Sequence, residues 1–473
     1  RKPDGYSSEI MDAIAAGNIG DGVLDASDEL PNIIFIQLES FFDVNYLNNM
    51  TFSENPVPNF TKLKEEYPSA FFSVPAIGAG TANTEFEVLT QMSLDYFGTG
   101  EYPYKTILKQ RTCESICYDL KELGYSAHAI HNHSGAFYDR NDVFSKLGFD
   151  TFTSLEYMQN ITYTPRGWCR DYVLTDEILK ALHSTDGQDL IYTISVQPHG
   201  RYPTSLSKYP DLEISVEGIE GKGKTAQFTY YVNQLHETDE FIGILLDRLE
   251  ELEEDTVVVM YGDHLPSLEI EETDLNEGNL FQTEYVIWSN FDLDAQAVDL
   301  YSYQLSAHVF SQLGISCGTM TKYHQQNMDA DEDEYQKNLE LLEYDILYGD
   351  MEVYNGVNPY EATDLKMGIS EINVTGAEYI GDSFCVTGDN FTEFSSVRIN
   401  GRLYDTMYVN RYTLLVIDVR KMDSCSIEVV QIGKNKEELS STDTYEFTAP
   451  PESDGDSSSL EDDMIDDLID DAG

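Results

Sequence analysis

The sequence is short of basic residues. Lys and Arg together number 28 against 86 Asp and Glu, so the 473-residue chain has a formal net charge of -58. A surface this acidic repels polyanions, which argues against nucleic acid or an anionic membrane surface as a docking partner. It attracts cations instead. A site for an anionic substrate therefore needs a metal ion or a local basic cluster to overcome the surrounding field.

Long apolar runs, paired cysteines and a signal peptide are also missing. No apolar run reaches the length of about 18 residues that a bilayer-spanning helix needs. The N-terminus, Arg1-Lys-Pro-Asp4, has no signal-peptide features, and we expect it to follow a segment that has been removed. Without a Cys-x-x-Cys pair the cysteines indicate no zinc ribbon, and they permit disulfides without demanding them. They are Cys113, Cys117, Cys169, Cys317, Cys385 and Cys425.

The hydrophobic fraction of 41% and the aromatic fraction of 12% are ample for packed cores, and the length predicts two or three domains. We expect a lead-in segment over residues 1–30 and a catalytic domain over 31–325. An acidic helical connector is expected over 326–367, an immunoglobulin-like β-sandwich over 368–448, and an acidic disordered tail over 449–473.

Four short apolar segments alternate with amphipathic helical patterns. The segments are nearly continuous in apolar residues, as strands buried on both faces are. This alternation predicts an α/β fold, with a mostly parallel sheet and helices on both of its faces. The predicted strands are residues 33–38, 125–130, 190–195 and 256–261. The clearest predicted helices are residues 106–123 and 228–253.

Each of these four strands is followed by side chains that can bind a metal ion or move a proton. In open α/β sheets the carboxyl ends of parallel strands meet at one edge, where ligands bind. The residues are Glu39, His131 with His133, His199, and Asp263 with His264. Two carboxylates and an imidazole suit a divalent ion such as manganese or zinc. For the Asp263-His264 pair alone, a solvated turn after the strand is the alternative.

The glycine-rich stretch Gly78-Ala-Gly80 delivers Thr81 to the predicted start of a helix that continues through residues 85–92. The unpaired N–H groups of a helix start favour an anion, so a phosphoryl group could lie over the Thr81 hydroxyl. A neighbouring metal ion would lower the pKa of this hydroxyl and make it a nucleophile. The alternative is that Thr81 only caps the helix.

A second set of polar side chains follows in two loops. The first loop contains His131, His133, Tyr138 and Arg140. Arg140 can hold a phosphate bidentately and Tyr138 can cover an apolar or polyol group; alternatively, Arg140 pairs with one of the many surface acids. His199, in the second loop, can protonate a leaving alkoxide or orient an attacking hydroxyl, or it is incidental.

Residues 31–322 resemble the extracellular catalytic domain of the lipoteichoic acid synthase family. Members are membrane-anchored phosphoglycerol transferases of the sulfatase and alkaline phosphatase superfamily. The Ile-Gln-Leu-Glu39-Ser stretch is similar to the family's first metal-ligand strand, and Asp263-His264 to its Gly-Asp-His ligands. Thr81 falls on the family's threonine nucleophile, which also ligates the metal.

The remaining motif residues follow the same order. Glu85 and Phe86 come after the threonine as they do in the family. His131 and Arg140 fall on substrate-binding positions, and the resemblance extends this role to the loop residues between them. His199 falls on the family's active-site histidine.

The sequence departs from the family pattern around the substrate headgroup. Tyr138 replaces the usual Trp, His133 stands where some members have Asp, and Gly80 stands where polyglycerolphosphate-forming members often carry Lys. These changes put the acceptor in doubt and leave the reaction type unaffected. Sulfatase chemistry is disfavoured, because no Cys-x-Pro-x-Arg or Ser-x-Pro-x-Arg occurs and Thr81 cannot become formylglycine.

The resemblance implies a two-step transfer at the extracellular face of a bacterial membrane. Thr81 would take phosphoglycerol from a phosphatidylglycerol-like lipid and pass it to a cell-envelope polymer or glycan, with one divalent ion, Mn²⁺ first and Zn²⁺ or Mg²⁺ as alternatives. An N-terminal membrane anchor outside this sequence is implied. A phosphoethanolamine transferase or a phosphodiesterase on the same fold is the enzymatic alternative, and an inactive polymer-binding scaffold is the alternative of another class.

The C-terminal third has short alternating strands separated by turn residues, which predicts the β-sandwich. Gly388-Asp-Asn-Phe391 followed by Val397-Arg-Ile-Asn-Gly401 resembles the IPT/TIG immunoglobulin-like family. We expect this module to act as a spacer or to bind wall polymer. The tail beyond it is rich in acids and contains no base.

Overall fold

The computed structural model describes residues 1–17 and 29–451, and these fall into two compact units. The larger unit comprises residues 1–132, 138–150 and 162–365. The smaller unit comprises residues 133–137 and 151–161 and the chain from residue 366 on. Most of the predicted acidic tail, from residue 452, and part of the predicted lead-in segment lie outside the described residues.

A mainly parallel sheet forms the centre of the larger unit. Its four predicted strands are neighbours and run parallel to one another, as expected. Within this unit the order is β10 (Leu300–Tyr301), β3 (Ser69–Ser73), β9 (Gln282–Ser289), β8 (Thr256–Gly262), β1 (Asn32–Leu38), β6 (Asp189–Ile194) and β4 (Ser126–His131). Every residue of β1, β6 and β8 is buried, which explains why these strands are continuously apolar.

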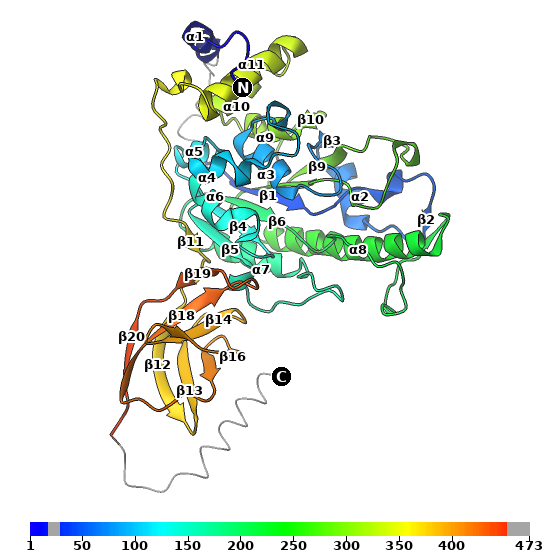
Figure 1. Ribbon diagram of the computed structural model, residues 1–473. Coiled ribbons are helices and arrows are strands. Elements are labelled where there is room, and N and C mark those ends of the chain that lie inside the picture. The colour runs from blue at the N-terminus through cyan, green and yellow to red at the C-terminus, as the bar shows by residue number, and fades with distance from the viewer. Residues whose placement is uncertain (18–28, 452–473) are drawn as a thin grey trace. The chain divides into compact units, whose positions relative to one another are not determined.

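Helices cover both faces of this sheet, as the α/β pattern predicted (Figure 1). One face carries α7 (Val173–Leu182) and α8 (Lys222–Glu250), which pack against each other. The other carries α3 (Thr81–Thr90), α5 (Ile116–Lys121) and α9 (Leu305–Gln312), with α3 in contact with both of the others. The helix predicted at residues 228–253 corresponds to α8, which begins six residues earlier.

The predicted helix at 106–123 is divided into two shorter ones. Its first part is α4 (Ile107–Gln110), which ends at Arg111 in an extended conformation, and its second part is α5. Ser115 lies between them and accepts a hydrogen bond from the Cys117 backbone N–H, 3.1 Å. A serine that caps a helix start in this way also interrupts a helix that comes before it. Its hydroxyl accepts a backbone N–H that would otherwise donate to a carbonyl of the preceding turn.

The other elements of the larger unit lie around this sheet. They are α1 (Ser8–Gly17), β2 (Thr51–Phe52), α2 (Pro58–Glu66), α6 (Arg140–Lys146), β7 (Val216–Glu217), α10 (Thr319–Asn327) and α11 (Glu332–Leu347). The first turn of α11 is acidic, and the Asp331 side chain caps it by accepting from the Glu334 backbone N–H. Among the helices of residues 1–17 and 29–451, none is both long and apolar enough to cross a bilayer.

The smaller unit contains antiparallel sheets that agree with the predicted β-sandwich. One sheet has the order β12 (Asn373–Ile380), β13 (Ser383–Asp389), β17 (Thr413–Val416) and β16 (Thr406–Asn410). The other has the order β15 (Arg402–Leu403), β14 (Ser395–Ile399), β18 (Ser424–Ile432) and β19 (Glu438–Ser441), with β20 (Tyr445–Thr448) also pairing with β18. Their shared core includes Phe384, Leu414, Ile427 and Phe447.

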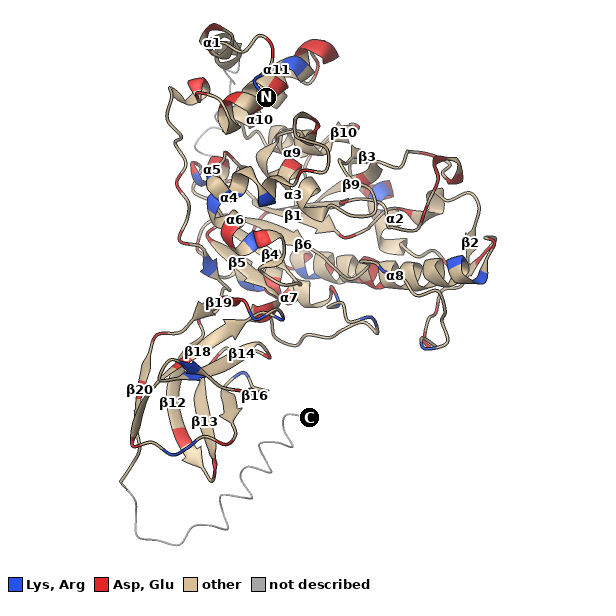
Figure 2. Ribbon diagram, in the orientation of Figure 1, with Lys and Arg blue, Asp and Glu red and all other residues tan. Residues whose placement is uncertain are grey.

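The excess of acids is spread over the chain and is not confined to one element. Figure 2 shows acidic positions along most of the helices, with basic positions scattered among them.

Candidate active site

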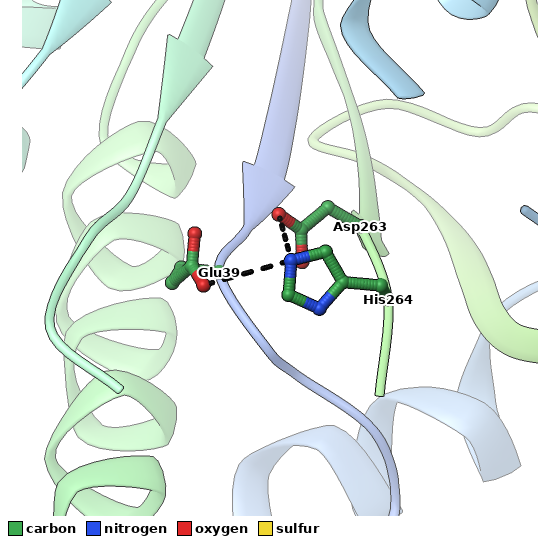
Figure 3. A group of neighbouring side chains, drawn as sticks. All are labelled: Glu39, Asp263 and His264. Carbon is green, nitrogen blue, oxygen red and sulfur yellow. Dashed lines mark ion pairs between the residues drawn. The ribbon is translucent and has the colours of Figure 1, made fainter. Parts of the chain in front are cut away.

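The carboxyl edge of the sheet brings Glu39, Asp263 and His264 together. In the parallel pairing of β1 with β8, Leu38 lies opposite Gly262, so the residues that follow each strand leave the sheet side by side. Figure 3 shows the three side chains pointing toward one another. His264 Nε2 lies 3.8 Å from Glu39 Oε1 and 3.4 Å from Asp263 Oδ2, and all three residues are buried.

Hydrogen bonds fix the two carboxylates. Ser40 donates twice, from Oγ to Glu39 Oε1 at 2.8 Å and from its backbone N–H to Asp263 Oδ1 at 2.8 Å. It does so from the left-handed region, with φ of 48°, which non-glycine residues seldom adopt. Such strain persists only where surrounding contacts hold it, and here it orients both acids.

Two atoms in this cluster are buried without a hydrogen-bond partner among the described residues: Asp263 Oδ2 and His264 Nε2. His264 Nδ1–H donates to the Leu265 carbonyl, 2.8 Å, so the lone pair of the neutral ring lies on Nε2, which faces the acids. A buried acceptor without a donor is costly, and a cation would satisfy both atoms at once. Glu39, Asp263 and His264 therefore fit a divalent metal ion.

Burial and the neighbouring Glu39 carboxylate raise the pKa of Asp263 to about 7. Burial lowers the pKa of His264, but the carboxylates of Asp263 and Glu39 outweigh it and leave the pKa above its ordinary value. Burial thus acts in opposite directions on the two groups, and the influence common to both upward shifts is the negative charge of a neighbouring carboxylate.

Thr81 lies inside this cluster as the first residue of α3. Its hydroxyl donates to Glu39 Oε2 at 3.0 Å, and its carbonyl accepts from Gln37 Nε2 at 3.0 Å. Thr84, one turn on, donates to the Asp263 backbone carbonyl at 2.9 Å. The start of α3 is thus tied to both β1 and the segment after β8.

Gly80 allows the sharp entry into this helix. Its φ is 106°, and a Cβ at this position would lie 2.8 Å from the Ala76 Cβ. A lysine at this position, which the resemblance noted in the sequence would suggest, would be strained in this backbone. The departure from the family pattern at Gly80 therefore has a local structural basis.

The two histidine loops meet the sheet at the end of β6. His131, the last residue of β4, donates from Nδ1 to the Ile194 carbonyl at 2.8 Å. Ser195 Oγ accepts the Glu39 backbone N–H at 2.8 Å, so His131 and Glu39 are anchored to adjacent residues. His199 follows in the same segment, and its Nδ1–H donates to the Gly200 carbonyl at 2.5 Å.

The sequence left two roles open for Arg140, phosphate binding and pairing with an acid, and in this structure Arg140 is paired with an acid. Its guanidinium is buried and donates from Nε and Nη2 to the two oxygens of Glu85, at 3.1 and 2.5 Å. Tyr138 lies under this guanidinium, with Cζ 5.2 Å from the ring centroid, and stacks on Tyr102 at 5.6 Å. His133 belongs to the smaller unit and contacts the Phe137 ring there.

Sequence reasoning missed several residues that shape this site. Ser40 and Ser195 orient the carboxylates, and Trp168 lies against the His199 ring with centroids 4.4 Å apart. Glu85 was noticed only as a motif residue and not as the partner of Arg140. The position of Ser40 directly after a strand-end ligand was a usable signal. Trp168 and Ser195 had none, because their contacts join segments far apart in sequence.

Comparison with known proteins agrees with this geometry. The chain is 30% identical over 267 residues to a Rhizobium meliloti (strain 1021) protein named for cyclic beta-1,2-glucan modification, covering 56% of this chain and 40% of that protein. It is 25% identical over 266 residues to the capsular polysaccharide biosynthesis protein RkpI of the same organism, covering 55% and 45%. The chain thus spans less than half of the length of either curated relative.

Solved structures share the fold. The Streptococcus pyogenes phosphoglycerol transferase GacH, in complex with sn-glycerol-1-phosphate, superposes with a TM-score of 0.64 at 24% identity over 75% of this chain and 97% of that one. The Listeria monocytogenes lipoteichoic acid synthase LtaP gives 0.53 at 16% identity over 75% and 100%. These are the kinds of protein that the sequence motifs predicted. Residues 31–343 match the Sulfatase family, and the chain belongs to that family.

Proposed function

We propose that this chain is the catalytic part of a metal-dependent phosphoglycerol transferase. It moves phosphoglycerol from a phosphatidylglycerol-like lipid, through a Thr81-linked ester, to a cell-envelope polymer or glycan. One observation carries the proposal: the Thr81 hydroxyl is bonded to Glu39 in a buried cluster where Asp263 and His264 each keep one unpaired atom.

The metal ligands are Glu39, Asp263, His264 and the Thr81 oxygen. When bound, a divalent ion would lower the pKa of the Thr81 hydroxyl and neutralise charge on the phosphate oxygens. Manganese is our first choice because the set mixes carboxylates with an imidazole, and zinc accepts the same donors. Magnesium is third, because it prefers oxygen ligands alone.

In the first half of the reaction the Thr81 oxygen bonds to the lipid phosphorus and the bond to the diacylglycerol oxygen breaks. The Thr81 hydroxyl proton passes to Glu39 Oε2, the oxygen to which this hydroxyl already donates. The hydrogen bond to Glu39 aims the Thr81 oxygen, and the first N–H groups of α3 face the phosphate. His199 gives a proton from Nε2 to the leaving alkoxide, since its Nδ1–H is held by the Gly200 carbonyl.

In the second half an acceptor hydroxyl replaces Thr81 on phosphorus. Glu39 returns the proton to the departing Thr81 oxygen, and His199 takes the proton of the acceptor hydroxyl. We propose that His131, Tyr138 and Arg140, all in the larger unit, form the headgroup side of the site, with Arg140 acting through Tyr138. A substrate-binding role for His133, in the smaller unit, stays a prediction from the sequence. The contact of the Arg140 guanidinium with the Tyr138 ring supports this order of contacts.

A glycan acceptor is supported by the relatives. The two Rhizobium meliloti proteins are named for glucan modification and for capsular polysaccharide biosynthesis, and GacH was solved with sn-glycerol-1-phosphate. Because the donor is a membrane lipid, we place the enzyme at the extracellular face of a bacterial membrane, held there by an N-terminal anchor. The smaller unit, for which the IPT/TIG resemblance remains a prediction, would space the enzyme or bind polymer.

The test is release of diacylglycerol from a fluorescent phosphatidylglycerol with added Mn²⁺. Thr81→Ala and a chelated sample should be inactive. Thr90→Ala, which removes a buried hydroxyl from the same helix, is the matched control and should retain activity, because the Thr90 hydroxyl bonds at the far end of α3, to the Phe86 carbonyl and the Met92 N–H.

Each negative result has its own meaning. A protein that binds metal but leaves this lipid intact would contradict the headgroup assignment, and phosphoethanolamine lipids and simple phosphodiesters would be tried next. A protein that binds no metal would contradict the catalytic proposal and leave the polymer-binding scaffold.

A further inference from the structure

Asp171 is a fully buried carboxylate that lies outside the metal cluster, yet it joins both loops that carry the active-site histidines. Its Oδ1 accepts from Asn132 Nδ2 at 2.9 Å and from the backbone N–H groups of Val196 and Gln197 at 3.0 and 3.3 Å. Its Oδ2 accepts from Thr238 Oγ1 of α8 at 2.8 Å. One side chain thus receives donors from three separate segments.

The donors lie close in sequence to the histidines. Asn132 directly follows His131, and Gln197 comes two residues before His199. The segment from Gln197 to His199 is short and follows β6 closely. In this segment the His199 backbone N–H donates to the Val196 carbonyl at 3.0 Å. Holding Val196 and Gln197 therefore sets where the chain turns toward His199.

The Asp171 backbone is fixed from the other side. Gln197 Oε1 accepts the Asp171 N–H at 2.9 Å, so Asp171 and Gln197 bind each other reciprocally. The Gln197 amide in turn donates to Gln234 Oε1 at 3.0 Å and to Glu237, and Glu237 pairs with Arg170. A network with this many partners holds its members within a narrow range of positions.

A carboxylate suits this place because an ionised carboxyl group accepts hydrogen bonds and donates none. Burial raises the pKa of Asp171 to about 6, while its hydrogen bonds lower it. Removing the acceptor would leave the Val196 and Gln197 backbone N–H groups buried without partners, and the Asn132 amide with only its 3.5 Å contacts to the Cys169 and Arg170 carbonyls. Those groups would move to find new acceptors, and the histidine loops would move with them.

We propose that Asp171 is the positioning residue that aligns His131 and His199 on one reaction centre. The inference rests on the proposed function for its effect on catalysis, but the placement of His199 can be measured without any substrate. Trp168 makes this possible, because its ring lies 4.4 Å from the His199 ring and comes from the same segment as Asp171.

The experiment uses ¹⁹F NMR of the whole chain labelled with 5-fluorotryptophan. The sequence has two tryptophans, so the spectrum has two resonances. Trp288 is buried on β9 against Tyr67 and reports the integrity of the sheet, while Trp168 reports the contact with His199. His199→Ala gives the shift that loss of this contact produces.

Asp171→Ala should shift the Trp168 resonance as His199→Ala does and leave the Trp288 resonance in place. Asp171→Asn should restore the wild-type spectrum, because its oxygen can accept from the loops while its amide donates to the Thr238 hydroxyl. Asp345→Ala is the control: it removes another buried acid that accepts two backbone N–H groups, and both resonances should stay.

In the lipid-release assay, Asp171→Ala should lose about 100-fold in kcat, as a displacement of about 1 Å at reacting groups does, and Asp171→Asn should recover most of it. An unshifted Trp168 resonance in Asp171→Ala would overturn the proposal. If this variant fails to fold, Thr238→Val decides: it removes the bond that fixes Asp171 Oδ2 to α8. A shift of the Trp168 resonance in the direction seen in His199→Ala is expected, and an unshifted resonance would overturn the proposal. A wild type inactive on the lipid would count against the proposed function alone, since the resonances are still measured.

Discussion

The buried Arg140–Glu85 ion pair gives the sharpest test of this structure. Both side chains are at most 1% exposed, and the guanidinium donates to both carboxylate oxygens. Burial lowers the pKa of Arg140, but Glu85 raises it by more, so the guanidinium is charged. Arg140→Met would leave the Glu85 carboxylate buried without its counterion.

Breaking one partner of a buried ion pair costs about 3–5 kcal/mol. The entropy of unfolding is about 2.1 cal/mol/K per residue, or about 0.66 kcal/mol/K for the region of residues 31–343. The expected decrease in melting temperature of the larger unit is therefore about 5–8 °C. The same change at Lys62, whose pair with Glu66 is 70% and 53% exposed, should cost less than about 1 kcal/mol.

A double-mutant cycle that adds Glu85→Gln measures the interaction energy between Arg140 and Glu85 separately from the effects of their other contacts. The double variant should be less destabilised than the sum of the single variants, because neither charge is then left alone. Calorimetry and urea unfolding would both be used.

Two results would refute this reasoning. One is a loss below about 1 kcal/mol in Arg140→Met, and the other is strict additivity in the cycle. If such a stable variant also showed a raised KM for the lipid, Arg140 would have to leave Glu85 to bind the headgroup, as the sequence motif first suggested.

Two further predictions concern the metal cluster. Mn²⁺ at 100 times its Kd should stabilise the wild type against thermal unfolding at pH 8 by about 2.7 kcal/mol. His264→Gln should lose most of this stabilisation. Equal stabilisation of both proteins would show that the ion binds elsewhere. Gly262→Ala should abolish Mn²⁺ binding in calorimetry. A Cβ at this position would lie 1.8 Å from the Phe41 carbonyl oxygen, so the segment that orients Asp263 would have to move. An unchanged Mn²⁺ affinity would contradict this prediction.

Several features of the protein followed from the sequence alone. The four core strands were predictable because a strand buried on both faces must be apolar throughout, and this pattern is local. Their order along the chain, with helices between, implied parallel pairing and so a common edge for Glu39, Asp263 and His264. The motif around Thr81 could be read for the same reason, since a helix start depends on neighbouring residues.

Elements that depend on distant partners were not predictable. The helix expected at 106–123 is interrupted because Ser115 caps a second helix, a choice that periodicity does not reveal. The position of Arg140 depended on whether a buried acid was available, and that acid, Glu85, lies 55 residues away. The excess of acidic residues indicated that Arg140 could pair with an acid, but it did not indicate which acid.

The sequence by itself determined the fold class and the chemical types gathered at one edge of the sheet, because apolar periodicity and strand-end residues are written locally. Only the tertiary structure decided which atoms face each other. Asp263 and His264, with their unpaired atoms Oδ2 and Nε2, face Glu39 from a remote segment. Asp171 likewise contacts both histidine loops from a segment more than 20 residues away from each. These segments meet only when the sheet is assembled. Hydrogen bonds act over about 3 Å, and no local pattern can report such a distance between remote segments.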